Sequence, residues 1–204
     1  MKRFVDVLLS VLMLILLAPF ILLIALFIRV DAGGPVLVLT HRVGKSGRML
    51  KVYEFRTAIA DADALETVAG CHGEQITRTG TLLRRFGVVR WPMLINVLRG
   101  ELSIVGPRAE MPRYVGCYPT AVRKSVLSIK PGLLDLASIS FNGEARLLAG
   151  LKDAELEEAY VEKVLPIRLD YAQQYVAQRG FWMDVRILVW SVVQLFWPFG
   201  LRSN

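Results

Sequence analysis

The sequence predicts a mixed α/β domain, mostly helical, that is attached to a membrane by its N-terminal segment. Residues Val7 to Ile28 form an uncharged apolar run of about 22 residues, which at ~1.5 Å per residue is long enough to cross a bilayer core. Residues 77–98 repeat apolar side chains every three or four positions, as a helix does. Two short β-prone runs, 36–40 and 51–57, predict a small β element.

Two features of the apolar run favour a helix–break–helix hairpin, which enters and leaves the membrane by one face, over a single spanning helix. Pro19 lies near its middle, where proline bends or breaks a helix. Lys2 and Arg3 precede the run and Arg29 follows it, and the positive-inside rule places such residues on the cytoplasmic side. Asp6 lies in the first turn and can pair with either arginine. We therefore expect residues 1–30 to form a re-entrant hairpin.

The composition restricts the class of partner. The chain carries a formal net charge of +7, and 54% of its residues are hydrophobic. Basic chains bind nucleic acid, anionic lipid or phosphorylated substrates. The apolar excess favours lipid and phosphate, and the middle of the chain lacks the aromatic residues interleaved with Lys and Arg that single-strand binders use, so we expect no nucleic acid. Cys71, Cys117, His41 and His72 lack the spacing of a metal site, so we expect no metal there.

The segment between the two β-prone runs reads RVGKSGR and is basic and glycine-rich. Its Gly-Lys-Ser is not a phosphate-binding P-loop, because that motif needs a glycine where Leu39 stands and a long helix after it. Residues 59–75 indicate a surface loop, with Asp61, Asp63 and Glu66 as an alternative cation site. Within 77–98 we expect two helices that meet at a kink at Pro92.

The C-terminal third predicts two kinds of helix. Residues 153–178 are charged and helical, and Gly180 ends this region. Residues 181–204 contain Trp182, Trp190 and Trp197, whose amphipathic rings favour lipid interfaces. We expect an interfacial amphipathic helix there, with packing against the globular part as the alternative. The predicted domains are a membrane hairpin (1–30), a globular domain (31–180) and this helix (181–204).

These motifs, in this order, resemble the bacterial sugar transferases, the monotopic phosphoglycosyl transferases of the small type that consists of the catalytic domain. The resemblance covers nearly the whole chain. It includes a Lys-Arg-x-x-Asp start, a central proline in the apolar run, an Arg-x-Gly-x-x-Gly segment, Phe-Arg-Thr, Asn-Val-Leu-x-Gly, Val-Gly-Pro-Arg, Lys-Pro-Gly and Asn-Gly. The matching residues include Lys2, Arg3, Asp6, Ala18, Pro19, Arg42, Gly44, Gly47, Phe55, Arg56, Thr57, Asn96, Gly100, Arg108, Glu110, Lys130, Gly132, Asn142 and Gly143.

The resemblance implies a reaction whose central residues are missing here. Active members move a phospho-sugar from a UDP-sugar to polyprenol phosphate, through a covalent intermediate on the aspartate of an Asp-Glu pair whose glutamate helps to hold Mg²⁺. The two positions are occupied by Val89 and Arg90. Valine cannot attack phosphorus, and the arginine repels a cation with an energy on the order of 4 kcal/mol per unit charge at 4 Å. We expect no catalytic residue, metal or cofactor in this chain.

The departures from the family pattern fall on polar functional positions, whereas the scaffold glycines and prolines are kept. Met93, Glu54 and His41 replace the usual Gln, Lys and Gln. This pattern predicts a catalytically inactive member that pairs with an active homologue, in a heterodimer, or with itself. One alternative is an active enzyme with a displaced nucleophile, for which the candidate carboxylates are Glu54, Glu101 and Glu110. Another is a membrane protein that binds UDP-sugar or polyprenol phosphate without turnover.

Several arginines remain that can bind phosphate by paired hydrogen bonds. Arg108, in its Gly-Pro-Arg turn, is the favoured anion site. For Arg84 and Arg85, binding of a phosphate ligand and contact with lipid headgroups or helix C-termini are equally good alternatives. The resemblance places the protein on the cytoplasmic face of a bacterial inner membrane, in contact with lipid. The full set of candidate phosphate ligands is Arg42, Arg56, Arg84, Arg85 and Arg108.

Overall fold

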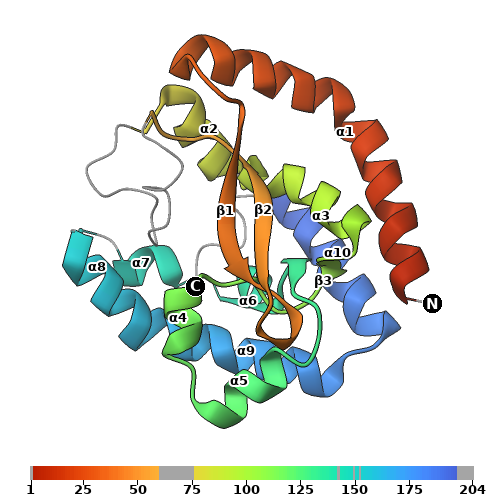
Figure 1. Ribbon diagram of the computed structural model, residues 1–204, viewed down its shortest axis with the longest axis vertical. Coiled ribbons are helices and arrows are strands. Elements are labelled where there is room, and N and C mark those ends of the chain that lie inside the picture. Colours follow the sequence, from red (N-terminus) through yellow and green to blue (C-terminus); the bar gives the residue numbers. More distant parts are fainter. Residues whose placement is uncertain (1, 60–75, 142, 149, 152, 197–204) are drawn as a thin grey trace. The chain divides into compact units, whose positions relative to one another are not determined.

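The computed structural model describes residues 2–59, 76–141, 143–148, 150–151 and 153–196, and confirms a mostly helical chain with a small sheet (Figure 1). The chain forms two compact units, which are Met1–His41 with Lys51–Leu102, and Arg42–Leu50 with Ser103–Asn204. Strands β1 (Leu37–Val43) and β2 (Met49–Phe55) pair in a two-stranded sheet around a 3₁₀ turn, η1 (Lys45–Gly47). The Gly-Lys-Ser segment thus lies in the turn between two strands and is followed by a strand, where a P-loop requires a long helix.

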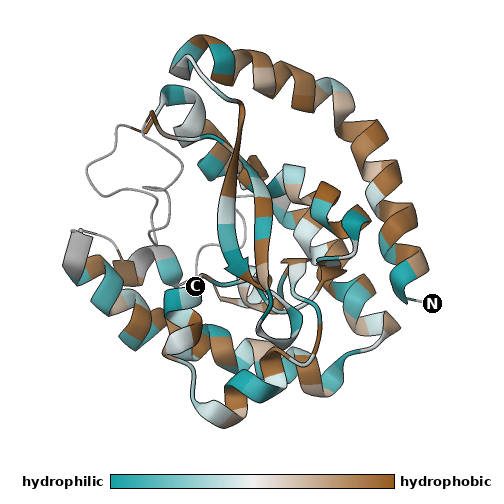
Figure 2. Cartoon of the chain, viewed as in Figure 1, coloured by the Kyte–Doolittle hydropathy of each residue, from teal (hydrophilic) through white to brown (hydrophobic). Residues whose placement is uncertain are grey.

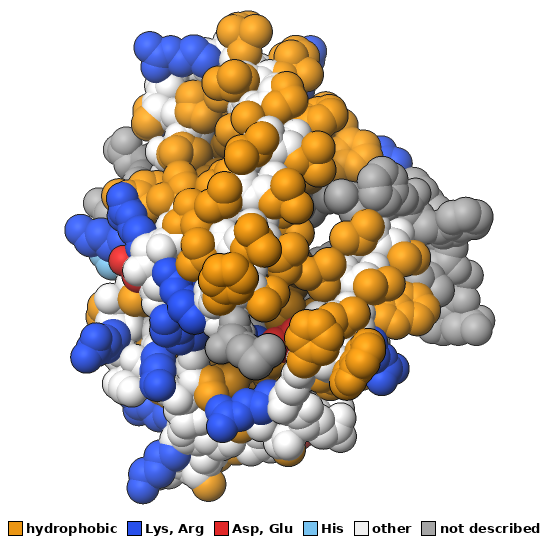
Figure 3. Space-filling view, turned by 90° about the vertical axis from the view of Figure 1, so that its right-hand side faces the viewer, with side chains coloured by type: hydrophobic (Ala, Val, Ile, Leu, Met, Phe, Trp, Pro, Cys, Tyr) orange, Lys and Arg blue, Asp and Glu red, His pale blue; other side chains and the backbone are white. Residues whose placement is uncertain are grey.

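Helix α1 (Lys2–Ala32) begins the first unit and is long and apolar enough to cross a membrane, judged by length and composition. Its apolar side chains cover the helix and are mostly exposed (Figures 2 and 3). The break predicted at Pro19 is not found, because the helix continues through this residue and bends along its course (Figure 1). One missing backbone hydrogen bond bends a helix without ending it when apolar side chains on both sides favour the same helix.

Both ends of α1 bind the ends of other helices in the first unit. Arg3 donates hydrogen bonds from its guanidinium to the carbonyls of Val97 and Leu98, the latter at 2.7 Å, at the C-terminus of α3 (Leu94–Arg99). Asp31 accepts a 2.8 Å bond from the Thr79 N–H, at the N-terminus of α2 (Arg78–Phe86). A cation at a helix C-terminus and an anion at an N-terminus each complement the helix dipole. The hydrogen bonds from Thr79 lower the pKa of Asp31.

The segment after α2 differs from the predicted pair of helices that meet at Pro92. Helix α2 is capped by Thr77, whose Oγ1 accepts a 2.8 Å bond from the Gly80 N–H, and it ends at Gly87, with a left-handed φ of 69°. A 3₁₀ helix, η3 (Val88–Met93), follows and contains Pro92. The interruption therefore lies five residues earlier than predicted, because a left-handed glycine ends a helix more sharply than a proline in its first turns.

Gly80 allows α2 to lie directly against the end of β2. A Cβ atom built on Gly80 would lie 2.0 Å from the Thr57 carbonyl oxygen, which is backbone and cannot move aside. We expect Gly80→Ala to destabilise the protein by about 2 kcal/mol, the usual range for overpacking. Urea unfolding in detergent micelles measures this. Gly116→Ala is the control, because a Cβ there meets nothing within 4 Å, and an equal loss in both variants would contradict the prediction.

The second unit is built on two short parallel strands, β3 (Ser103–Val105) and β4 (Gly132–Leu134). The glycines of the Gly-Pro-Arg and Lys-Pro-Gly motifs permit this pairing, because a Cβ on Gly132 would lie 2.1 Å from the Gly106 nitrogen. Helices α5 and α6 pack on α9, and α10 packs on α6 and both strands. The helical segments of this unit are α4 (Pro112–Gly116), α5 (Thr120–Val126), α6 (Leu136–Ser140), α7 (Glu144–Leu148), α8 (Asp153–Ala159), the π-helical η4 (Tyr160–Val164), α9 (Leu165–Gln178) and α10 (Phe181–Phe196).

Helix α10 has one face packed in the second unit and one face exposed to solvent. Ile187 is fully buried, and Gln194 donates a 3.0 Å bond to the Ile139 carbonyl. Phe181, Trp182 and Trp190 are exposed, Trp182 to 80%. One face of the helix therefore packs against the globular part and the other exposes aromatic side chains, and an amphipathic helix in contact with lipid stays a prediction. Trp197 and the proposed cation ligands Asp61, Asp63 and Glu66 lie outside the described residues.

Candidate functional site

Val89 and Arg90, the two positions that the sequence resemblance assigns to an Asp-Glu pair, lie in η3 of the first unit. Val89 packs against a buried apolar cluster formed by Ile28, Phe55, Leu83 and Val88. Its side chain is half-buried and offers no oxygen, and the neighbouring Arg90 is a half-buried cation. These residues do not fit a divalent cation, whose ligands are oxygens. The residue at the position that the resemblance assigns to the nucleophile is therefore a partly buried apolar contact of this cluster.

Two candidate phosphate ligands, Arg56 and Arg84, donate hydrogen bonds to oxygen atoms of the chain itself. Buried Arg56 donates from Nε to the Ala58 carbonyl at 2.8 Å and from Nη2 to the Ile59 carbonyl. Arg84 donates from Nη2 to Thr57 Oγ1 at 2.8 Å. The structure thus brings both around the segment that follows β2, where they support its backbone. Arg85 is exposed at the end of α2, and Arg42 is buried on the part of β1 that belongs to the second unit.

Glu101, a candidate substitute nucleophile, is held by a buried amide. Asn96 is fully buried and donates from Nδ2 to Glu101 Oε2 at 2.6 Å and to the Lys51 carbonyl at 2.8 Å. Its Oδ1 accepts a 3.1 Å bond from the Tyr53 N–H. Asn96 therefore ties α3 to β2 and orients Glu101 toward the protein. The sequence offers a signal for this role, since an amide lies between apolar residues of a short helix.

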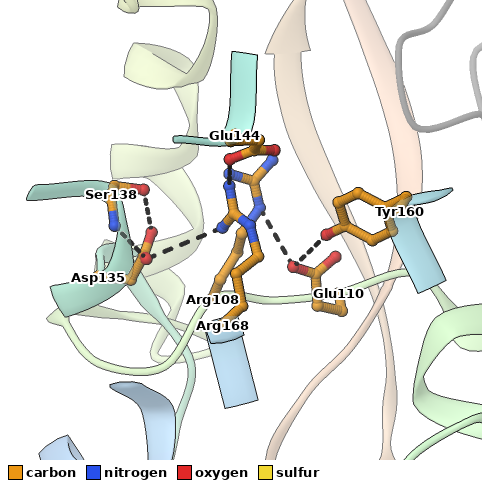
Figure 4. Close-up of polar contacts among 7 residues, drawn as sticks. All are labelled: Arg108, Glu110, Asp135, Ser138, Glu144, Tyr160 and Arg168. Carbon is orange, nitrogen blue, oxygen red and sulfur yellow. Dashed lines mark hydrogen bonds and ion pairs between the residues drawn. The ribbon is translucent and has the colours of Figure 1, made fainter. Parts of the chain in front are cut away.

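A network of charged side chains lies in the second unit and contains Arg108 and Glu110 (Figure 4). Glu110 Oε1 lies 3.5 Å from Arg108 Nε and accepts a 3.1 Å hydrogen bond from the Tyr160 hydroxyl. Arg168, on α9, pairs with Glu144 at the start of α7 and lies 4.0 Å from Asp135. Asp135 also caps α6 by accepting bonds from the N–H and the hydroxyl of Ser138, at 2.9 and 2.6 Å.

Each guanidinium of this network has a carboxylate of the protein beside it. Two guanidiniums face three carboxylates, so a further anion among them gains little. Burial lowers the pKa of Arg168, but Asp135, Glu110 and Glu144 outweigh it and raise the pKa overall, so the side chain stays charged. Burial, with the nearby Glu110, raises the pKa of Tyr160, so its hydroxyl stays neutral and donates. The network is thus a structural connection between α6, α7, η4 and α9.

The space beside this network is small. Arg108, Glu110, Asp135 and Arg168 line it together with tyrosines and apolar residues, and its volume is about 20 Å³, room for one water. A sugar nucleotide does not fit inside. Arg108 has a side chain that is 32% exposed, so its guanidinium also reaches the surface of the unit. Of the predicted phosphate ligands of the second unit, it is the one placed to meet an anion from solvent.

The Tyr160 hydroxyl donates a hydrogen bond to Glu110, and removal of this hydroxyl is expected to lower the stability of the protein. We expect Tyr160→Phe to destabilise the protein by about 1.5–3 kcal/mol, because a buried carboxylate loses a charge-assisted hydrogen bond. Urea unfolding of the micelle-bound protein measures this. Tyr114→Phe is the matched control, since the Tyr114 ring packs on Tyr160 and its hydroxyl has no hydrogen-bond partner among the described residues. Equal losses in the two variants would show that the Glu110 contact contributes nothing.

Four members of this network are not predictable from the sequence as one cluster, namely Asp135, Glu144, Tyr160 and Arg168. A signal exists for Arg168, which interrupts the apolar face of residues 164–175, but its partners lie far away in the sequence. Among the described residues, no group of three or more His, Cys, Asp or Glu is placed to hold a metal ion. Cys117 is a free, exposed thiol, and Cys71 and His72 lie outside the described residues.

Comparisons with known proteins agree on one family. Residues 1–198 match the bacterial sugar transferase family. The chain is 44% identical to the exopolysaccharide production protein PSS of Rhizobium leguminosarum bv. phaseoli, covering 95% of this chain and 94% of that protein. It is 29% identical to the UDP-glucose:undecaprenyl-phosphate glucose-1-phosphate transferase of Escherichia coli K12, covering 96% of this chain and 40% of that protein. It is 32% identical to an undecaprenyl-phosphate glucose phosphotransferase of Komagataeibacter xylinus, covering 35% of that protein. The chain thus spans less than half the length of these last two relatives.

Proposed function

The chain belongs to the bacterial sugar transferase family, and we propose that it is a catalytically inactive member that pairs with and supports an active homologue in the synthesis of polyprenol-linked polysaccharide. The observation that carries this proposal is the packing of Val89 at the nucleophile position into the cluster of Ile28, Phe55, Leu83 and Val88. The names of the relatives supply the substrate class, a UDP-sugar and a polyprenol phosphate.

The contacts of the candidate substitute carboxylates support inactivity rather than a displaced reaction centre. Glu110 is buried and accepts a hydrogen bond from the Tyr160 hydroxyl, and Glu101 accepts one from the Asn96 side-chain amide. A nucleophilic carboxylate needs a lone pair directed at the phosphorus, in a space that admits the substrate. Glu54 lies half-buried on β2, where a carboxylate replaces the lysine of the family pattern.

The contacts of α1 support attachment to one face of the membrane. Arg3 and Asp31, at opposite ends of the helix, both bind helices of the same compact unit. A straight spanning helix would hold its ends about 30 Å apart on opposite sides of the bilayer core, where one folded unit cannot bind both. We therefore propose a re-entrant α1, with its ends on the cytoplasmic face of the inner membrane.

The topology is tested by labelling from one side. Single cysteines at Lys2 and Val30, in a Cys71→Ser/Cys117→Ser background, are treated with a membrane-impermeant maleimide in inverted and right-side-out vesicles. We expect both positions to react only in inverted vesicles. Reaction of the two positions from opposite sides would establish a spanning helix and overturn the re-entrant proposal.

The functional proposal is tested with the purified chain in nanodiscs that contain undecaprenyl phosphate. A relative with a complete Asp-Glu pair is the control. We expect release of UMP from UDP-glucose to be lower than in the control by a factor on the order of 10⁶, as for loss of a nucleophile. Gentle extraction of the tagged chain from its host should yield a homologue with an intact pair in stoichiometric amount. A phospho-sugar adduct trapped on Glu54, Glu101 or Glu110 would establish the displaced nucleophile instead.

A further inference from the structure

Four exposed cations gather in the second unit, outside the site described above. Lys45 and Arg48 flank the tip of the β1–β2 hairpin, and Arg123 and Lys124 lie in the last turn of α5. We call these four residues the basic tip patch. The helix dipole of α5 accounts for a cation at its C-terminus, but it does not account for two further cations brought there by a separate segment.

The patch is held in a fixed shape by backbone contacts. The Ser46 N–H donates a 2.8 Å bond to the Leu127 carbonyl at the end of α5, and the Val43 N–H donates a 2.9 Å bond to the Glu110 carbonyl. Ser46 and Gly47 have left-handed φ angles of 58° and 78°, which make the turn tight. The hairpin tip and α5 therefore present their charges as one surface.

The charges of the patch are not balanced within the protein. Residues 42–50 and 111–134 contain no aspartate or glutamate. Within the described part of the chain, none of the four cations makes an ion pair, in contrast to Arg108, Arg113 and Arg168. Four neighbouring like charges repel one another, so the patch is complementary to a surface of high negative charge density.

We infer that the basic tip patch binds the anionic headgroups of membrane lipids. Met49, next to Arg48, is 56% exposed, so the tip joins an apolar side chain to cations, the composition of interfacial segments. The same unit exposes Phe181, Trp182 and Trp190 on α10, and α1 is long and apolar enough to cross a membrane. An acidic protein would match the charges but would leave Met49 without a role. The patch would contact lipid whether or not the chain is catalytically active.

Hydrogen–deuterium exchange of the full chain in nanodiscs tests this inference. Each cation near an anionic surface strengthens the attraction about fivefold. We expect backbone exchange in residues 44–50 and 120–127 to be severalfold slower in discs of phosphatidylcholine with phosphatidylglycerol than in phosphatidylcholine alone. High salt should remove the difference, because it screens exposed charges.

Charge reversal separates lipid contact from other causes. Lys45→Glu/Arg48→Glu should abolish the effect of phosphatidylglycerol, whereas Lys163→Glu/Arg179→Glu, which changes two exposed cations of the same unit outside the patch, should keep it. Equal exchange in the two lipids would overturn the inference. So would protection that survives charge reversal, or protection that arises only when an acidic partner protein is added.

Discussion

Replacement of Arg168 by methionine is expected to destabilise the protein by about 3–5 kcal/mol, the usual result of removing one partner from a buried ion pair. Arg168 is 8% exposed and lies between Glu144 and Asp135. Without its guanidinium Glu144 loses its ion pair and buried Asp135 loses a nearby cation. Urea unfolding in micelles measures the loss, and because α6, α7 and α9 meet at this residue, we expect them to lose structure together.

Two further variants decide whether the charge itself matters. Arg179→Met removes an exposed cation just after the end of the same helix, and we expect a change within about 0.5 kcal/mol, as for surface positions. Arg168→Met/Glu144→Gln should be more stable than Arg168→Met alone, because it removes the charge of the carboxylate that loses its ion pair. If the loss of stability in the double variant equalled the sum of the losses in Arg168→Met and in Glu144→Gln, Glu144 and Arg168 would not be coupled.

The features predictable from the sequence are those set by local patterns. The apolar run predicts α1. The β-branched and aromatic residues on either side of a glycine-rich turn predict the hairpin of β1 and β2. The position of the break after α2 was not predictable in this way. Gly87 and Pro92 both interrupt helices, and only the tertiary packing of Leu83 and Val88 into one cluster selects Gly87.

The network around Arg168 could not be predicted from local sequence patterns, for a different reason. Its members, Glu110, Asp135, Glu144 and Tyr160, come from separate segments, and each of them alone is compatible with a solvated surface. The parallel pairing of β3 with β4, which needs Gly132 to pass close to Gly106, brings the segments that carry Glu110 and Asp135 together. The family motifs of this unit therefore include residues whose role is packing as well as residues that face a ligand.

Val89→Asp, which restores the residue type of the family nucleophile, is expected to reduce stability by about 2–3 kcal/mol and to give no transfer. Val89 packs on the cluster that contains Ile28 from α1 and Phe55 from β2, and a carboxylate placed there loses hydration without gaining a partner. Val89→Ile, which keeps the apolar contact, is the control and should change stability by less than about 1.5 kcal/mol. Unfolding in micelles and UMP release from UDP-glucose measure the two effects.

The double variant Val89→Asp/Arg90→Glu decides how far the scaffold has departed from an enzyme. If only the pair had been lost, restoring it would recover a covalent phospho-sugar adduct, which mass spectrometry detects on residue 89. We expect no adduct, because Glu54 and Met93 also replace polar groups of the family pattern, and because Arg56 and Arg84 donate to carbonyl and hydroxyl groups of the chain itself. An adduct would mean that the unit still holds a nucleotide sugar in a reactive position. The chain would then be an enzyme that lacks two side chains, and the cluster around Val89 would be a consequence of their loss.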